Sequence, residues 1–324
     1  MSNRWARTAA VVVALISGAG CAASVSDGPA TTQTPRVAET DGTATPVIEQ
    51  RRIVPLGGDI TEVVFALGLG GDVVAIDLST TFPSEALGLP KIGFERALNA
   101  EPILAVEPTD IVATDAAGPE STLAELARVG VPVTVIEREY SSTGPARKIR
   151  EVAAALDVSD EGDRVADEVQ AQIDAATVDP SVYSRPMRVV ALYLRGDDLQ
   201  FVLGAGAGAH WVIEAAGAVD IADGLGVVET APITIEAILA AAPDAIIVPE
   251  SGLVSAGGVD ALLAVPGVAE TPAGRSGAIY AYDDQLMLGN GPRTPEFLRQ
   301  LVADLHDLDA RCPDVPCPPR EAQP

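Results

Sequence analysis

The sequence predicts an α/β protein made of two similar α/β lobes joined by a long bridging α-helix. The first observation is an internal repeat, because the pattern of residues 98–112 returns at residues 233–247. Each copy places a glutamate, Glu101 or Glu236, shortly before an Ile-Leu pair, and a proline and an apolar run follow. A helix that breaks at a proline and leads into a buried strand is therefore expected twice.

Apolar runs alternate with helical patterns in both halves of the chain, which is the second observation. In the first half we expect strands at residues 53–56, 73–76, 111–113 and 133–136, and helices at residues 61–69, 99–106 and 121–129. In the second half we expect strands at residues 189–194, 246–248 and 279–282, and helices at residues 210–216, 235–241 and 294–305. Alternating strands and helices form mainly parallel sheets, so each half predicts one α/β lobe.

Two helical segments between the halves are the third observation. They cover residues 145–156 and 159–176, are rich in Asp, Glu and Arg, and have no further core to fill. Ser159 is expected to cap the second helix. A helix of about 17 residues is roughly 25 Å long, which is enough to run along both lobes as a stiff strut.

The first 21 residues have the pattern of an export signal. Arg4 and Arg7 precede an apolar stretch at residues 9–16, and small residues lead to Cys21. The stretch is shorter than the roughly 20 apolar residues that a membrane span needs, so cleavage is expected. Cys21 resembles the lipidated cysteine of bacterial lipoproteins, although Gly18 stands where an aliphatic residue is usual. The alternative is an ordinary secretory signal with an incidental cysteine.

Composition sets the remaining boundaries. Residues 22–50 are rich in Ser, Thr, Pro, Asp and Gly and cannot bury enough apolar surface to fold. The expected organisation is a signal peptide at 1–21, a disordered tether at 22–50, an N-terminal lobe at 51–140, linking helices at 141–186, a C-terminal lobe at 187–310 and a flexible tail at 311–324.

Charge and residue counts exclude several classes of function. The formal net charge is −25 and the only lysines are Lys91 and Lys148, which excludes nucleic acid as a partner. An anionic ligand must therefore be met by individual arginines. Cys312 and Cys317 have the export context in which a small disulfide can form, and no spacing typical of a metal site is present.

An enzyme is not expected. Glycines alternate with alanines over residues 204–208 after an apolar run, but their spacing misses the dinucleotide-binding pattern G-x-G-x-x-G. His210 and His306 are the only histidines, and neither lies in a recognisable catalytic signature. Two histidines are also too few for a zinc or manganese importer protein.

The signal, the tether, the two lobes and the bridging helix together resemble the substrate-binding proteins of ATP-driven importers for haem, ferric siderophores and cobalamin. The strings most similar to the haem binders are residues 93–101, 192–196, 257–263, 283–289 and 291–296. The resemblance implies the helical-backbone periplasmic binding protein fold, a cleft between the lobes and little hinge motion. It also implies an exported protein, lipid-anchored to the outer face of the cytoplasmic membrane, that delivers haem to an ABC permease with its ATPase. Haem is then the transported ligand rather than a catalytic cofactor, and a siderophore or cobalamin is the alternative cargo.

The resemblance implies specific haem ligands. Tyr193 matches an iron ligand and Arg195, two residues later, stabilises its phenolate. Arg96 matches an arginine that faces the haem propionates, and Arg293 lies in a matched loop with a less certain role. The alternative for Tyr193 is a strand tyrosine that packs its ring in the core.

Phe94 departs from the family pattern, because haem binders of this type commonly have Tyr or His there. Either Tyr193 is the sole ligand and Phe94 stacks on the macrocycle, or another residue substitutes. His210 is the weaker alternative iron ligand, and Met287 is weaker still because a methionine in an apolar run is usually core.

Glu101 and Glu236 match the two exposed glutamates that engage arginines of the permease in this family. The alternative is that each glutamate only opens a helix, where the helix dipole favours a carboxylate.

Overall fold

The computed structural model describes residues 50–196, 199–232 and 234–312, which fall within one compact unit at residues 49–324. The predicted signal peptide, Cys21, almost the whole predicted tether and Cys317 lie outside the described residues. Cys312 is buried and disulfide-bonded. Among the residues described, no helix combines the length and the apolarity that crossing a membrane requires.

The first sheet is parallel, with strand order β1-β2-β3. Its strands are β1 (Ile53–Leu56), β2 (Asp110–Thr114) and β3 (Val133–Ile136), accompanied by the helices α1 (Gly58–Ala66), α2 (Ala100–Leu104) and α3 (Glu120–Arg128). The strand expected at residues 73–76 is wrong as a continuous strand. Only isolated bridges form there, from Val73 to Ile53 and from Ile76 to Lys91, so this segment pairs at its two ends alone.

The second sheet is mixed, with the path β7-β5-β4-β8-β9 and β6 paired to β4. Its strands are β4 (Arg188–Arg195), β5 (Leu199–Leu203), β6 (Val219–Asp220), β7 (Thr230–Pro232), β8 (Ala245–Pro249) and β9 (Ile279–Tyr282). β4, β8 and β9 pair in parallel, as predicted, and the two-residue β6, which was not predicted, also pairs in parallel with β4. β5 and β7 add an antiparallel edge that the sequence analysis missed.

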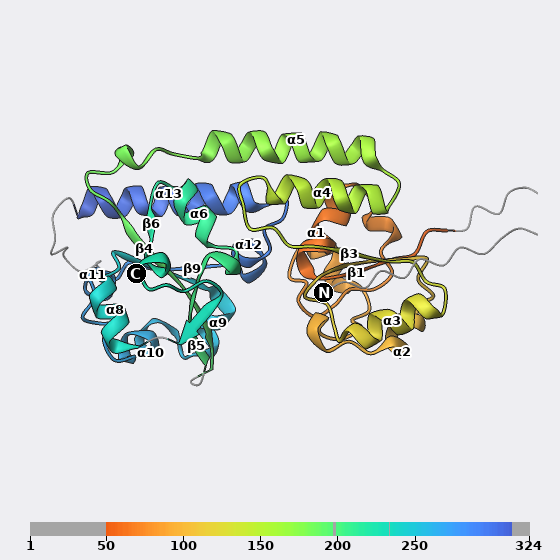
Figure 1. The fold of residues 1–324 in the computed structure, drawn as a ribbon, viewed down its shortest axis with the longest axis horizontal. Coiled ribbons are helices and arrows are strands. Elements are labelled where there is room, and N and C mark those ends of the chain that lie inside the picture. Colours follow the sequence, from red (N-terminus) through yellow and green to blue (C-terminus); the bar gives the residue numbers. More distant parts are fainter. Residues whose placement is uncertain (1–49, 197–198, 233, 313–324) are drawn as a thin grey trace, which may run out of the picture. The chain divides into compact units, whose positions relative to one another are not determined.

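The helices of the second half surround this sheet (Figure 1). They are α6 (His210–Ala215), α7 (Ile221–Gly224), α8 (Ile235–Ala241), α9 (Glu250–Ser255), α10 (Gly258–Ala264), α11 (Pro272–Ser276), α12 (Asp284–Leu288) and α13 (Thr294–Arg311). The first glycine after β5 is required by a close approach of the backbone. A side chain on Gly204 would meet the carbonyl oxygens of Val227 and Val228 at 2.2 and 2.6 Å, so only glycine fits there.

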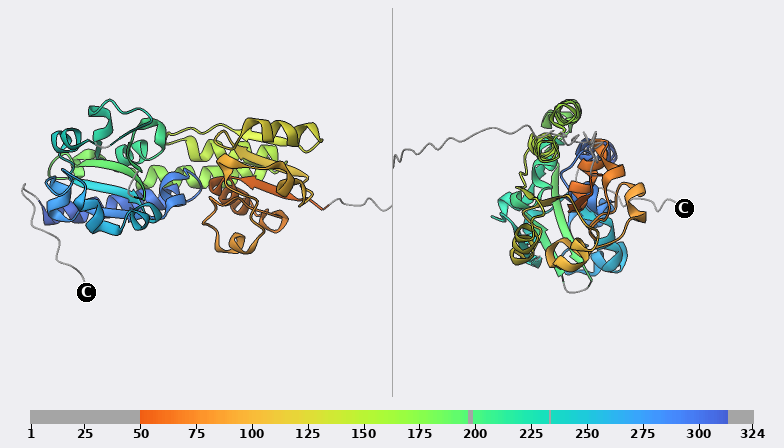
Figure 2. Two further views of the ribbon diagram at one scale, coloured as in Figure 1. Left: turned by 90° about the horizontal axis from the view of Figure 1, so that it is seen from below. Right: turned by 90° about the vertical axis from the view of Figure 1, so that its right-hand side faces the viewer.

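The two linking helices are α4 (Gly144–Ala155) and α5 (Ser159–Ala176). They lie side by side, as the end-on view in Figure 2 shows, and α5 also packs on α13 of the second lobe. The expected strut is therefore present. Ser159 is not its N-cap, however, because the helix begins at Ser159 and Val158 occupies the cap position without a side-chain hydrogen bond.

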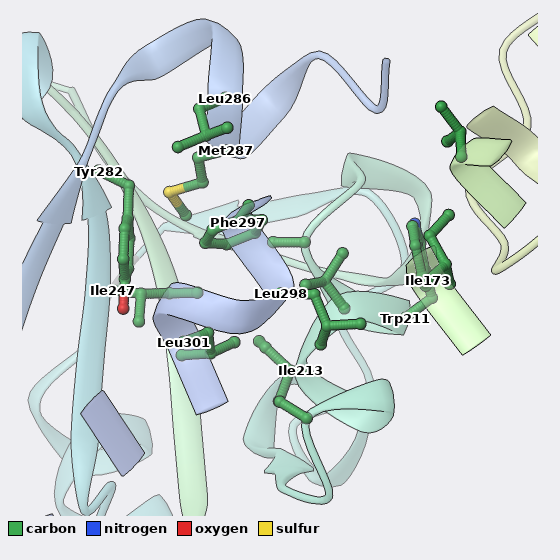
Figure 3. Close-up of a cluster of buried hydrophobic side chains, with 14 of the residues drawn as sticks. Ile173, Trp211, Ile213, Ile247, Tyr282, Leu286, Met287, Phe297, Leu298 and Leu301 are labelled. Atoms are coloured by element: carbon green, nitrogen blue, oxygen red, sulfur yellow. The ribbon is translucent and has the colours of Figure 1, made fainter. Parts of the chain in front are cut away.

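The largest core cluster joins the helices of both halves to one face of the second sheet. Figure 3 shows part of it, where Trp211 of α6 and Ile173 of α5 lie near Leu298 of α13. Met287 is 2% exposed within this cluster, which agrees with the interpretation of this methionine as a core residue.

The internal repeat is real in three dimensions. α2 leads to β2 in the first lobe, and α8 leads to β8 in the second. Before each strand one non-glycine residue takes the left-handed conformation, Glu107 in the first copy and Ala242 in the second, both with φ of 45°. Each of these residues directly precedes the proline of its repeat, so the two copies share a backbone turn as well as a sequence pattern.

Candidate functional site

The carboxyl edge of the first sheet gathers acidic side chains. Asp77 is fully buried, accepts hydrogen bonds from the backbone amides of Gly57 and Ser79, and follows the segment that bridges to β1. Asp59 opens α1, and Glu95 lies close to Gly57. In open α/β sheets ligands bind at the carboxyl ends of the strands, so this edge is a candidate ligand surface.

Glu95 is the most perturbed carboxyl group of this edge. Burial, followed by the neighbouring carboxylates of Asp77 and Asp59, raises the pKa of Glu95 to about 7. A carboxyl group with this pKa is partly protonated at neutral pH and can donate a hydrogen bond as well as accept one.

Arg138 and Tyr140 belong to the same edge and were missed by the sequence analysis. Arg138 follows β3 closely, forms an ion pair with Asp115 at the end of β2, and donates to the Tyr140 hydroxyl at 3.2 Å. The available signal was their position directly after an apolar run in a predicted parallel sheet. Arg138 adds a cation to this mainly acidic edge.

Phe94 and Arg96 flank Glu95 in the loop before α2. Phe94 is 38% exposed, and the Arg96 side chain is 61% exposed and lies 3.6 Å from the carboxylate of its neighbour Glu95. Both side chains are therefore available to a ligand, one with an apolar face and one with a positive charge.

Tyr193 and Arg195 lie at the end of β4, where the sequence placed them. Neighbouring Leu192 and Leu194 point into one core, whereas Tyr193 is half-buried on the other face of the sheet and packs against the large core cluster with its ring. Within the described part of the chain, the Tyr193 hydroxyl makes no hydrogen bond, and Arg195 is exposed. A half-buried phenol without a protein partner suits a metal-ligand role.

Gln285 of α12 joins the two lobes through a buried hydrogen-bond network. Its side-chain oxygen accepts from the backbone amides of Thr81 and Phe82, and its nitrogen donates to the Gly58 carbonyl at 2.8 Å and to Glu62 at 2.9 Å. Because Gly58 follows β1 and α12 follows β9, the carboxyl edges of the two sheets meet here.

Arg293 belongs to this junction. Its guanidinium bonds to the buried Glu62 at 3.1 Å and to Asp283 at 3.3 Å, and lies 3.8 Å over the ring of Phe82. Burial raises the pKa of Glu62, while Arg293 and Gln285 oppose that shift. Arg293 therefore makes protein contacts between the two lobes and stabilises the edge of the predicted cleft.

A second polar link joins α4 to both lobes. Lys148 is 3% exposed, pairs with Asp59 of α1 and donates to the Gly289 carbonyl at 2.8 Å. Asn290 accepts from the indole of Trp211 at 3.0 Å and donates to the Glu139 carbonyl at 2.7 Å. The lobes are therefore fixed to one another by buried polar contacts as well as by the helical strut.

His210 begins α6 and is occupied by carboxylates of its own lobe. Its Nδ1 lies 3.0 Å from the buried Asp220, and its Nε2 lies 3.4 Å from Glu214. The described structure gives no contact between His210 and Tyr193 or Arg195. It therefore does not bring this alternative iron ligand together with the tyrosine.

Glu101 and Glu236 occupy equivalent positions, each as the second residue of its helix, and both side chains are exposed. Thr234 caps α8 by accepting from the Ala237 amide at 3.2 Å, whereas Asn99 makes no side-chain cap for α2. Neither glutamate is tied into a core, so both remain open to a partner.

Two α/β lobes that meet at their carboxyl edges and are tied by a helical strut define a two-lobed ligand-binding protein. The chain belongs to the periplasmic binding protein family, whose model matches residues 53–286. It is similar to the periplasmic haem-binding protein RhuT from Roseiflexus sp. RS-1, with 44% identity and a TM-score of 0.78 over 80% of this chain and 99% of that one.

Two further relatives bear on the ligand. The Y-to-A variant of the haem-binding protein HmuT is 29% identical, with a TM-score of 0.74 over 79% of this chain and 81% of that one. The vitamin B12-binding protein of Vibrio campbellii is 28% identical over 129 residues, 39% of this chain. That match spans 45% of the relative, so the chain covers less than half the length of this curated protein. All of these relatives are named as binding proteins rather than enzymes.

Proposed function

We propose that this protein is the extracytoplasmic substrate-binding component of an ABC importer that captures haem between its lobes and delivers it to a permease. The observation that carries the proposal is the half-buried, unpartnered phenol of Tyr193, two residues before an exposed arginine at a strand end. HmuT has been studied as variants of a tyrosine and of an arginine two positions later, the spacing of Tyr193 and Arg195.

The surrounding chemistry suits haem, which presents a broad apolar face and two carboxylates. Exposed apolar side chains in the segment between α1 and α2 supply the first requirement, notably Leu78 and Phe94. Arg96 and Arg138 supply cations at the edge of the first sheet for the propionates. Phe94 then stacks on the macrocycle, because its ring has no metal-ligating atom.

Cobalamin is the second candidate, favoured by the B12-binding relatives. Haem explains more of the site, because cobalamin carries amide side groups and gives the exposed arginines no carboxylate partners. A ferric siderophore is the remaining alternative for the same transport role.

Glu101 and Glu236 are the proposed docking points for the permease. They are exposed, and they occupy equivalent places on two related lobes. A two-sided permease entrance with arginines on each side would pair with both. We further propose that lipidated Cys21 holds the protein at the outer face of the membrane.

The test is a haem titration of the purified protein followed by absorption spectroscopy. The wild type is expected to give a Soret shift and the charge-transfer band of a phenolate-bound ferric haem, and Tyr193→Phe to lose that band while keeping the ring in place. Arg96→Ala should weaken binding by about 1.5 to 3 kcal/mol, roughly 10- to 150-fold. Arg128→Ala, an exposed arginine on α3, serves as the matched control.

No Soret shift at micromolar concentrations would refute haem as the cargo, and binding of cobalamin or a siderophore would then replace it. If Tyr193→Phe keeps the wild-type spectrum while His210→Ala changes it, the fold and transport role stand and the ligand assignment is wrong.

A further inference from the structure

Three side chains of the second lobe converge on its surface in a way the proposed transport function does not use. His210 and Glu214 are one turn apart on α6, with 3.4 Å between Nε2 and Oε2. Asp223 reaches them from α7, with its Oδ1 at 3.8 Å from the imidazole Nδ1. One ligand atom from each residue lies within 4.8 Å of the other two.

The imidazole is held by a buried carboxylate behind it. Asp220 is 1% exposed at its side chain; one carboxylate oxygen accepts from the Ala222 amide at 2.9 Å, and the other lies 3.0 Å from His210 Nδ1. Because an ionised carboxylate only accepts hydrogen bonds, Nδ1 must carry the proton. The neutral ring then presents the lone pair of Nε2 towards Glu214, and the exposed Asp223, which now lies nearer Nδ1, rotates to reach an ion bound at Nε2.

We propose that His210, Glu214 and Asp223 bind a divalent transition-metal ion of the zinc class. A ligating histidine typically donates its other N–H to a carboxylate, which is the arrangement that Asp220 makes. One imidazole nitrogen with two carboxylates suits zinc and its neighbours, whereas magnesium and calcium prefer oxygen ligands alone.

The surroundings allow an ion to enter and complete its coordination. Glu214 and Asp223 are each 58% exposed, so both can rotate from their present positions to metal-bond distances of about 2 Å. A hollow of about 610 Å³ adjoins the site, and its lining includes His210, Glu214 and Tyr140. Water in that hollow can fill the remaining coordination positions.

The competing explanation is a protonated His210 that forms ion pairs with the surrounding carboxylates and binds no metal. Zinc and cobalt titrations of the full, metal-free chain separate the two. We expect one zinc ion per chain by calorimetry, a visible absorption band on adding cobalt, and no comparable binding of magnesium.

Site variants assign the ion to these residues. Glu214→Gln and Asp223→Asn should each weaken zinc binding at least tenfold and reduce the cobalt band, with unchanged circular dichroism. Asp260→Asn, an exposed carboxylate on α10, removes the same charge elsewhere and should bind as the wild type does. Equal affinity in all of these proteins would overturn the proposal and leave general attraction to an acidic chain.

Asp220→Asn tests the positioning role of the buried carboxylate. An amide has one oxygen, which the Ala222 amide requires, so its NH₂ group would face His210 and move the imidazole proton to Nε2. Zinc affinity should then fall 10- to 100-fold although all three ligands remain. Unchanged affinity together with an unchanged cobalt spectrum would show that Asp220 does not orient the histidine, and would remove the support it gives to the site.

Discussion

Replacing Lys148 with methionine is expected to destabilise the protein strongly, because it breaks the buried contact that joins α4 to both lobes. The Lys148 and Asp59 side chains are 3% and 11% exposed. Methionine fills much of the same space without a charge. Asp59 is then left as an unpaired buried carboxylate near Glu95, and the Gly289 carbonyl loses its donor.

The magnitude follows from the cost of leaving one member of a buried ion pair alone. Removing one partner typically costs about 3 to 5 kcal/mol, which is a large share of the roughly 5 to 15 kcal/mol that stabilise a folded domain. At about 2 to 4 °C per kcal/mol for a chain of this size, the thermal midpoint should fall by about 10 °C.

Urea unfolding and calorimetry measure this loss, and the chain offers a matched control. Lys91 is the only other lysine and is exposed, so Lys91→Met should change the free energy of unfolding by about 0.5 kcal/mol or less. Adding Asp59→Asn to Lys148→Met should recover part of the loss, because the unpaired charge is removed with its partner. Equal effects of the two lysine variants, or strict additivity with Asp59→Asn, would refute the reasoning.

Three further predictions concern single groups. Glu95 has a folded pKa of about 7 against an ordinary value of 4.5, so the free energy of unfolding should fall as the pH rises from about 4.5 to 7. Glu95→Gln should remove that slope and add on the order of 1 to 2 kcal/mol to the free energy of unfolding at pH 8 after solvent screening, with no gain at pH 4. A wild-type free energy of unfolding that rises over this pH range would contradict the prediction. Replacing Glu101 and Glu236 with alanine should abolish cargo uptake by cells while leaving cargo affinity unchanged; lost affinity would place them in the binding site instead. Cys21→Ser should release the protein from the membrane fraction, and retention at wild-type level would rule out the lipid anchor.

Much of the fold was predictable because its signals are local. The strand at Ile279–Tyr282 and the helices at Ser159–Ala176 and Ile235–Ala241 have the predicted bounds, since apolar periodicity and breaking residues mark them within the segment itself. The β5 strand was missed although it directly follows β4 in the chain, because a short apolar run before glycines does not show that it pairs antiparallel with β4 on one side and with the later β7 on the other.

The candidate site was predictable in part for the same reason. Tyr193 and Arg195 lie on a clear strand, and their position at its end followed from the sequence. Arg293 was predicted only to lie in a matched loop of the cleft, and besides Asp283 it contacts Glu62 and Phe82, which are more than 200 residues away in the chain. No local sequence pattern predicts a contact between residues so far apart in the chain.

The junction between the lobes determines how such a protein can discriminate its cargo. Separating the lobes would leave the buried Glu62 without Arg293 and Gln285, and would strip the amides of Thr81 and Phe82 of their acceptor. Buried polar groups that lose their partners cost about 1 to 3 kcal/mol each, and charged ones cost more. Wide separation of the lobes therefore has a high free-energy cost, so little binding selectivity can come from closure of the lobes around a ligand. Selectivity is then expected from side chains already in position, and the proposed ligand residues Tyr193, Arg96 and Arg138 are the ones that should provide it.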